Sequence, residues 1–273
     1  MSNFEEVLSL LPAAESPKQT TIGSVPCILH EDHRWVLPVV YSAQQASFLP
    51  KPCTVVMFDR HTDSLDPFGR CGHELRQLRQ EPTLQGVVSL CEKHLLRVDN
   101  DWLKAGMQLG LFDDAVIFGA IENGCEMSKV YSDHLGNPHR ILAHRLLPRY
   151  VLGDAISRDQ FGPVWDILGW EVTCKGGVFL PDQPKVFLTI DLDCFAIPWD
   201  EYTFAWPTKM FEGEFSSERT KIDWNGRDYL KGLGSKSGLV AIAREHGCCG
   251  GMEDAETILQ NLIHYGFDGQ LSF

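Results

Sequence analysis

The stretch that decides the fold spans residues 53–63 and reads Cys53-Thr54-Val55-Val56-Met57-Phe58-Asp59-Arg60-His61-Thr62-Asp63. Its first half is apolar and rich in β-branched residues, which is typical of a buried strand. Its second half is a D-x-H-x-D motif at the carboxyl end of that strand, the edge where open α/β sheets bind ligands. Side chains two residues apart point the same way in extended backbone, so Asp59, His61 and Asp63 are expected to converge. Two carboxylates and an imidazole suit a divalent ion such as Mn, Fe, Co or Zn.

A second stretch far along the chain repeats this pattern. Val186-Phe187-Leu188-Thr189-Ile190 is another apolar run, and Asp191-Leu192-Asp193 follows it directly. A single acidic triplet can arise by chance in a solvated loop. Two strand-end acidic motifs are harder to explain in that way, because uncompensated carboxylates at a buried sheet edge repel one another and lose their hydration. A pair of divalent cations would offset both costs.

The rest of the chain alternates between apolar runs of strand length and segments with helical spacing. This alternation predicts an α/β fold with three layers, α/β/α, in which helices cover both faces of a mostly parallel central sheet. We expect a single domain over residues 1–273, with an N-terminal helix and a linker in residues 1–21. The expected strands are 25–29, 53–58, 115–119, 186–190 and 239–243, and the expected helices are 3–11, 84–96, 101–109, 225–233 and 254–265.

Two long segments lack a clear period. Residues 66–79 are predicted to be a loop that passes into a charged segment. Residues 199–222 are aromatic and are predicted to be a long loop that faces the substrate. Loops of this length in a compact domain usually carry a function, so residues 199–222 are a candidate lid or substrate-facing loop.

Composition narrows the class of protein. The formal net charge of −13 argues against a nucleic-acid partner or an anionic membrane, and it favours a basic substrate. Residues 1–11 lack the basic start and long apolar core of a signal peptide, so the nine cysteines are expected to be reduced and the protein cytoplasmic. No apolar run is long enough to span a bilayer. The sequence does not indicate an oligomeric state.

The order of these motifs resembles a known family. A strand-end His33, then the D-x-H-x-D triplet, then the D-x-D pair and a strand-end Glu245 are similar to the ureohydrolase branch of the arginase–deacetylase superfamily. The match concerns motifs from about His33 onward rather than continuous sequence. Within the superfamily, Glu31-Asp32-His33, Asn100-Asp101-Trp102 and Asp191-Leu192-Asp193-Cys194-Phe195 resemble a divergent branch. That branch includes peptide arginases, which convert arginine side chains of ribosomal peptides to ornithine.

This resemblance implies an arginase-like fold and two Mn²⁺ ions per chain, held by six side chains that follow strands. These are Asp59 and Asp191 bridging both ions, His33 and Asp63 at one ion, and His61 and Asp193 at the other. The expected reaction is hydrolysis of a guanidinium group, which releases urea.

The resemblance also implies roles around the substrate. Glu245 would pair with the guanidinium group, and His73 is the candidate that passes a proton to the leaving amine. An ordinary surface histidine is an equally acceptable reading of His73. Asn100, Asp101 and Glu122 are the remaining candidates for substrate contacts, although Asn100 or Asp101 also suits the N-cap of the following helix.

The chain departs from the family at several places. His30-Glu31-Asp32-His33-Arg34 replaces the usual Gly-Gly-Asp-His-Ser, which leaves His30 as a rival ligand. Residues 64–70 lack the Asn/Ser-rich loop that holds the α-carboxylate of free arginine, and only Glu122 is available for its α-amine. A substrate whose backbone is already in peptide bonds needs neither contact. The expected substrate is therefore an arginine-containing peptide.

Two other functions stay open. One is a small-molecule ureohydrolase, such as a free arginase or an agmatinase-like enzyme. The other is a non-catalytic, metal-stabilised protein that binds a basic peptide. A mononuclear zinc deacetylase is disfavoured, because the sequence lacks the paired-histidine dyad of that pattern.

Overall fold

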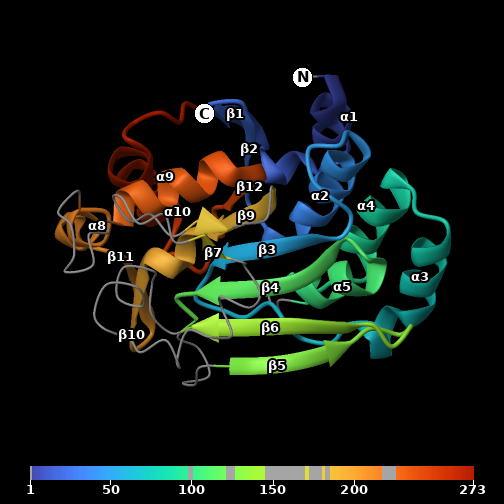
Figure 1. Ribbon diagram of the computed structural model, residues 1–273. Helices are drawn as coiled ribbons and strands as arrows, with labels where there is room; N and C mark the ends of the chain where they lie inside the picture. The colour runs from blue at the N-terminus through green and yellow to red at the C-terminus, as the bar shows by residue number, and fades with distance from the viewer. Residues whose placement is uncertain are drawn as a thin grey trace.

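The computed structural model describes residues 2–97, 101–120, 127–144, 170–171, 180–181, 185–216 and 226–273. In these residues an eight-stranded sheet has the order β1-β2-β12-β9-β3-β4-β6-β5 (Figure 1). The strands are β1 (Lys18–Ile22), β2 (Val25–His30), β3 (Cys53–Phe58), β4 (Phe112–Phe118), β5 (Met127–Ser132), β6 (Pro138–His144), β9 (Val186–Asp191) and β12 (Ser237–Ala243).

The six central strands are parallel, and an antiparallel strand closes each edge. β1 pairs with β2, and β5 pairs with β6, both in antiparallel register. Two short hairpins lie outside this sheet and consist of β7 (Trp170–Glu171) with β8 (Leu180–Pro181), and β10 (Ala196–Trp199) with β11 (Tyr202–Ala205). The mostly parallel sheet that the sequence predicts is therefore confirmed.

Helices cover both faces of the sheet. The main helices are α1 (Ser2–Leu10), α2 (Val36–Gln45), α3 (Phe68–Gln80), α4 (Leu84–Lys93), α5 (Trp102–Leu109), α8 (Thr208–Glu214), α9 (Gly226–Lys236) and α10 (Met252–Asn261). Single turns lie at η1 (Ala13–Glu15), η2 (His33–Trp35), η3 (Leu192–Phe195) and η4 (Leu262–Gly266). Figure 1 shows α8, α9 and α10 gathered around one end of the sheet and α1 to α5 around the other.

The side chains of β3 show how one strand serves both layers. Val55 and Met57 belong to the apolar core that includes α2 and α5, whereas Val56 and Phe58 belong to the core that includes α9 and α10. Because successive side chains of a strand point to opposite faces, a continuous apolar run fits a strand that is covered on both sides.

The N-terminal segment corrects one prediction. The expected linker contains β1, which extends the sheet beyond β2. Its Thr20-Thr21-Ile22 run is β-branched and pairs readily with an exposed sheet edge, which outweighs the turn-forming residues before it.

The two expected loops are also partly ordered elements. Residues 68–80 form α3, because Cys71 and Leu75 are one helical turn apart and bury the same face. Within residues 199–222 the chain forms the end of the β10–β11 hairpin and then α8, and residues 217–222 lie outside the described part. In both segments, polar residues between the buried ones obscure the spacing that is typical of a helix or a strand.

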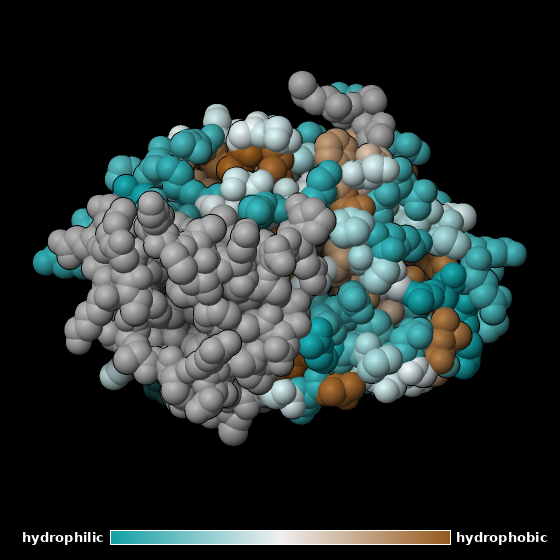
Figure 2. Space-filling model, in the orientation of Figure 1, coloured by the Kyte–Doolittle hydropathy of each residue, from teal (hydrophilic) through white to brown (hydrophobic). Residues whose placement is uncertain are grey.

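The described surface that is visible in the orientation of Figure 1 is mostly hydrophilic, with small separated hydrophobic areas (Figure 2). Among the described residues, no helix is both long and apolar enough to cross a membrane. The seven cysteines in the described part of the chain are all free thiols.

Candidate metal centre

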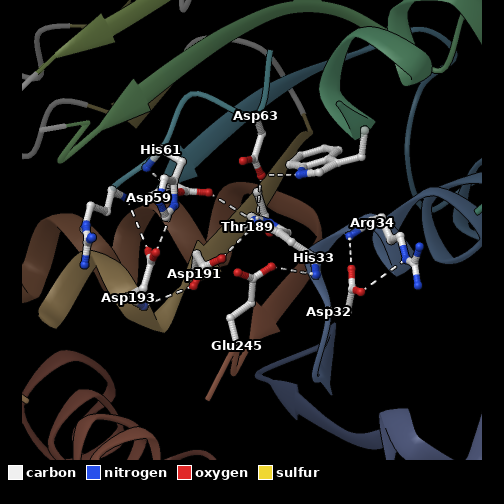
Figure 3. A network of polar contacts seen from close by, with 12 residues as sticks. Asp32, His33, Arg34, Asp59, His61, Asp63, Thr189, Asp191, Asp193 and Glu245 are labelled. Atoms are coloured by element: carbon white, nitrogen blue, oxygen red, sulfur yellow. Dashed lines mark hydrogen bonds and ion pairs between the residues drawn. The ribbon is translucent and has the colours of Figure 1, made fainter. Parts of the chain in front are cut away.

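Four neighbouring strands deliver the candidate ligands to one edge of the sheet. β2, β12, β9 and β3 are adjacent and parallel, so their carboxyl ends meet. His33 follows β2, Glu245 follows β12, and Asp191 ends β9. The D-x-H-x-D motif follows β3. Figure 3 shows these side chains pointing toward one another, although they come from segments far apart in the chain.

His33 stands at the middle of the cluster. Its Nδ1 atom lies 3.3 Å from an oxygen of Asp59, 3.2 Å from one of Asp63 and 3.3 Å from one of Asp191. On the other side of the ring, Nε2 lies 2.7 Å from Thr189 Oγ1. One ring nitrogen cannot donate a proton to three acceptors at once. The nitrogen and the oxygens of Asp59 and Asp191 belong to a group of donor atoms that could hold a metal ion.

A second group of donor atoms lies beside the first. His61 Nδ1 is 2.9 Å from Asp193 Oδ2 and 3.5 Å from Asp59 Oδ1. The backbone N–H of Asp193 donates to Asp191 Oδ1 at 3.0 Å, which fixes the two carboxylates of the D-x-D pair. We call His33, Asp59 and Asp191 the His33 group, and Asp59, His61 and Asp193 the His61 group. Asp59 belongs to both.

The carboxylates of the cluster are unfavourable without a cation. Burial, and then the nearby charge of Asp63, raise the pKa of Asp59 to about 7. Burial, and then the charge of Asp193, raise the pKa of Asp191 well above its usual range. Burial alone would lower the pKa of His61, but its contacts with Asp193 and Asp59 raise it to about 12. Every shift favours more positive charge at this point, which bound dications would supply.

The residues present fit divalent metal ions. Carboxylate oxygens and imidazole nitrogens are ligands of Mn, Fe, Co and Zn. The contact between His33 Nε2 and Thr189 leaves Nδ1 as the ligand atom, which is how a partner on one ring nitrogen sets the role of the other. His33 Nδ1 is buried and has no hydrogen-bond partner that satisfies normal geometry among the described residues.

Asp63 completes the His33 side of the centre. Its backbone φ is 46°, and its carbonyl accepts a hydrogen bond from Leu103 N at 3.2 Å, which ties the D-x-H-x-D loop to the start of α5. The indole N–H of Trp102 donates to Asp63 Oδ2. Gly106 permits this arrangement, because a Cβ atom there would collide with Phe112 and push α5 away from the sheet.

Glu245 lies at the rim of the cluster. Its φ of 35° turns the chain just after β12, and its N–H donates to Glu31 O at 2.9 Å. Its Oε1 accepts the backbone N–H of His33 at 3.1 Å. Burial, and then the charge of Asp191, raise the pKa of Glu245 well above its usual range. The neighbouring Arg244 pairs with Glu31 instead, so Glu245 does not serve as its salt-bridge partner.

A cavity of about 340 Å³ opens next to Glu245. Its lining combines carboxylates with a thiol, a guanidinium and an imidazole. The lining residues are Glu31, Asp32, Arg97, Glu245, His246, Gly247 and Cys248. A cationic group that entered this cavity would meet three carboxylates.

The two histidines that the sequence left as rival ligands lie in different surroundings. His33 joins the cluster, whereas His30 does not belong to any of the donor groups found among the described residues. His30 ends β2 and is fully buried, with its Nδ1 atom 3.1 Å from Asp32 O. Burial lowers the pKa of His30 to about 3, so its ring is neutral.

Other predicted site residues lie elsewhere. His73 is exposed on α3, and none of the described contacts of the cluster involves it, so the expectation of a proton shuttle gains no support. Asp101 precedes α5, but its buried carboxylate is occupied by Arg70 and by Leu96 N at 3.3 Å. It therefore links the residue before α5 to Arg70 of α3 and to Leu96, and it makes no side-chain cap to α5. Asn100 and Glu122 lie outside the described residues.

Sequence reasoning missed three supporting residues. Thr189 is the one hydroxyl in an otherwise apolar strand run, which is a signal that a buried partner exists. Trp102 stood within a quoted motif but received no role. Glu15 is buried, and its Oε2 accepts the N–H groups of Glu31 at 3.2 Å and Asp32 at 2.9 Å. It thereby fixes the loop that carries His33, and no local pattern could have revealed this contact.

No protein-family model matches this chain, and no curated protein matches it either.

Proposed function

We propose that this chain is a binuclear metal-dependent hydrolase that converts arginine side chains in a peptide to ornithine and releases urea. The observation that carries the proposal is the contact of His33 Nδ1 with three carboxylate oxygens at 3.2–3.3 Å, beside a second histidine–carboxylate group that shares Asp59. A buried histidine that only forms hydrogen bonds would use one acceptor for each ring nitrogen and not three.

The proposed cofactor is a pair of Mn²⁺ ions. The His33 group and Asp63 would hold one, the His61 group would hold the other, and Asp59 would contact both. When bound, such a pair supplies a nucleophile near neutral pH by lowering the pKa of water. The oxygen-rich donor set agrees with Mn²⁺, whose ligands are mostly carboxylates and water.

Glu245 would orient the substrate. A carboxylate can hold a planar guanidinium through two charge-assisted hydrogen bonds, and correct placement of the reacting carbon accounts for a large part of the rate. Glu245 is held by the N–H of His33, which also belongs to the centre, and it borders the cavity. The substrate cation and the ligands would therefore be positioned by the same piece of backbone.

A peptide is the preferred form of the substrate. The chain carries a net charge of −13, so basic peptides would be attracted, and Glu245 at the cavity could pair with their guanidinium groups. Free arginine would require groups for its α-carboxylate and α-ammonium. Sites built for such polar groups reject analogues that lack them, because the groups of the site are left unpaired.

One observation favours a second candidate, a small-molecule ureohydrolase. Arg97 also lines the cavity, and its guanidinium is the kind of group that binds the carboxylate of free arginine. Arg97 is 70 % exposed and already lies 3.7 Å from Asp32, which weakens this alternative.

The test compares kcat/KM for free arginine, agmatine and a peptide with an internal arginine, after loading with Mn²⁺. Urea and the mass loss of the peptide are followed together. The peptide is expected to be converted fastest, and metal-free protein should release no urea. A preference for arginine or agmatine would replace the peptide reading with the second candidate. Metal binding without any urea from the three substrates would reject the hydrolase itself.

A further inference from the structure

A pair of adjacent cysteines lies beside the proposed centre and has no part in it. Cys248 and Cys249 follow Glu245 in a tight turn, in which Cys248 N donates to Glu245 O at 2.7 Å. The Cys248 side chain is half-buried and lines the cavity, whereas Cys249 is fully buried. Cys249 Sγ lies 3.2 Å from Arg244 O, so its thiol is directed into the protein. The two cysteines therefore have different environments despite being neighbours.

Donor atoms of Asp193, Glu245 and Cys248 lie within 4.8 Å of one another. Asp193 lies in η3, directly after β9, while the other two come from the turn after β12, so the group is built by the fold and not by one loop. Asp193 is fully buried, and its Oδ2 atom accepts no well-aligned hydrogen bond among the described residues, although His61 Nδ1 lies 2.9 Å away. That oxygen has coordination capacity left for a further ion.

We propose that Asp193, Glu245 and Cys248 form a third cation site, selective for thiophilic dications such as Zn²⁺, at the boundary between the metal centre and the cavity. Neither the His33 group nor the His61 group contains sulfur. A thiolate is a ligand of Zn²⁺ and contributes little to the binding of Mn²⁺. The third site would therefore prefer Zn²⁺ to Mn²⁺, whereas the His33 and His61 groups suit both ions.

The local charge allows a third ion. Asp59, Asp63, Asp191, Asp193 and Glu245 bring five carboxylates together, and two dications do not neutralise them fully. A zinc ion deprotonates a thiol that coordinates it, so Cys248 would bind as a thiolate.

The cavity gives the ion a path to the site, since both Glu245 and Cys248 line it. An ion bound there would engage the carboxylate that the proposed function assigns to the substrate guanidinium. This consequence, unlike the site itself, rests on the proposed function. Zn²⁺ would then inhibit the Mn²⁺-loaded enzyme by competing with the cationic substrate.

The first experiment detects the thiolate directly, without any assay of activity. The full chain is loaded with Mn²⁺ and then titrated with Co²⁺, which reports thiolate ligation by a sulfur-to-cobalt charge-transfer absorption in the near ultraviolet. This absorption is expected in the wild-type chain, is expected to be lost in Cys248→Ser, and is expected to persist in the matched control Cys249→Ser. Its absence from the wild type, or its survival in Cys248→Ser, would overturn the site.

A second measurement uses only the wild-type chain, so it does not depend on how a variant folds. Iodoacetamide labelling is followed for each cysteine by peptide mass spectrometry, with and without Zn²⁺. Zn²⁺ is expected to protect Cys248, while Mn²⁺ should not. Equal labelling of Cys248 in the presence of either ion would contradict the proposal.

The inhibitory consequence is tested in the urea assay. Cys248→Ser is expected to weaken inhibition by Zn²⁺ about tenfold or more, because even outer partners of a metal site change its affinity by roughly 10- to 100-fold. Unchanged inhibition in Cys248→Ser would mean that Zn²⁺ acts at another place. If the cobalt absorption is present and no substrate yields urea, the proposed function fails while the third site stands.

Discussion

The two halves of the candidate centre have the same ligand chemistry but different surroundings. The side chain of His33 is 1 % exposed, is held by Thr189 from β9, and contacts Asp63, which Trp102 fixes. The side chain of His61 is 16 % exposed; its backbone N–H donates to Asp59 Oδ1 at 2.6 Å, and its ring lies 2.9 Å from Asp193. We expect the His33 group to hold its ion tightly and exchange it slowly, and the His61 group to exchange its ion faster.

The largest effect is expected where the two halves meet. Asp59→Asn removes the carboxylate that both groups share, so metal content should fall from two ions to nearly none and urea release should be lost. The measurement is metal analysis after gel filtration. Asp114→Asn is the matched control, because Asp114 is also a buried carboxylate but pairs with Arg140.

Folding can be separated from metal loss in this variant. Asp59→Asn removes a buried negative charge, so the metal-free variant should be at least as resistant to heat as the metal-free wild type. An Asp59→Asn protein that keeps both ions and its activity would show that the two groups do not share a ligand.

The next effect concerns Glu245, whose described hydrogen bond to the His33 side comes from the backbone N–H of His33. Glu245→Gln should lower kcat/KM about 100-fold or more, because the guanidinium loses its charged partner and its alignment. Both metal ions should remain, since the amide can still accept the N–H of His33. Kinetics near those of the wild type would mean that another acid holds the substrate.

Substitutions within each half should sharpen the contrast between them. His61→Ala should release one ion and leave the other bound. Thr189→Val should leave both ions bound but weaken one of them about 10- to 100-fold, as is usual when a partner of a ligating histidine is removed. Competition with a chelator measures the two affinities. If His61→Ala loses both ions, the halves are not independent.

Acidity should change the stabilisation by metal in a defined direction. Asp59 has a pKa of about 7 in the metal-free fold and about 3.9 in an unfolded chain, so metal-free stability falls as the pH rises from about 4 to about 7. His61, raised to about 12, extends the fall above about 6.5. Ligands must lose these protons to bind metal. The Mn²⁺-induced rise in Tm should thus be larger at about pH 8 than at about pH 6. Each kcal/mol of additional unfolding free energy corresponds to about 2–4 °C in Tm. Equal rises would refute this linkage.

The smallest effect is expected at His73. Its exposed position on α3 gives it no described contact with either half, so His73→Gln should change kcat by less than about twofold, as exposed substitutions usually do. A large loss of kcat with an unchanged KM would restore His73 as the proton shuttle.

The sequence predicted the parts of the site that local pattern determines. The ends of β3 and β9 were identifiable because an apolar run and an acidic pair are adjacent in the chain. His33 and His30 could not be separated in the same way. The choice depends on η2, which begins after Asp32 accepts the N–H of Arg34 at 3.2 Å and turns His33 toward the cluster.

The parts that were missed depend on contacts between distant segments. Residues 68–80 look like a charged loop until Cys71 and Leu75 find a core to bury against. Cys248 lies close to Asp193 of η3, which follows a different strand, and the position of the two cysteines in the sequence does not indicate this contact. Side-chain groups assembled across a sheet need the strand order before they can be recognised.

Glu15 has a practical consequence for the amino-terminal end of the chain. Its carboxylate holds the N–H groups of Glu31 and Asp32, and β1 anchors the segment that presents it. The residues before β2 therefore stabilise the wall of the cavity, and their deletion is expected to disturb it. A shortened protein that starts at β2 would keep every proposed metal ligand and still lose the rigidity of the loop beneath His33, so its defect would resemble that of a damaged site.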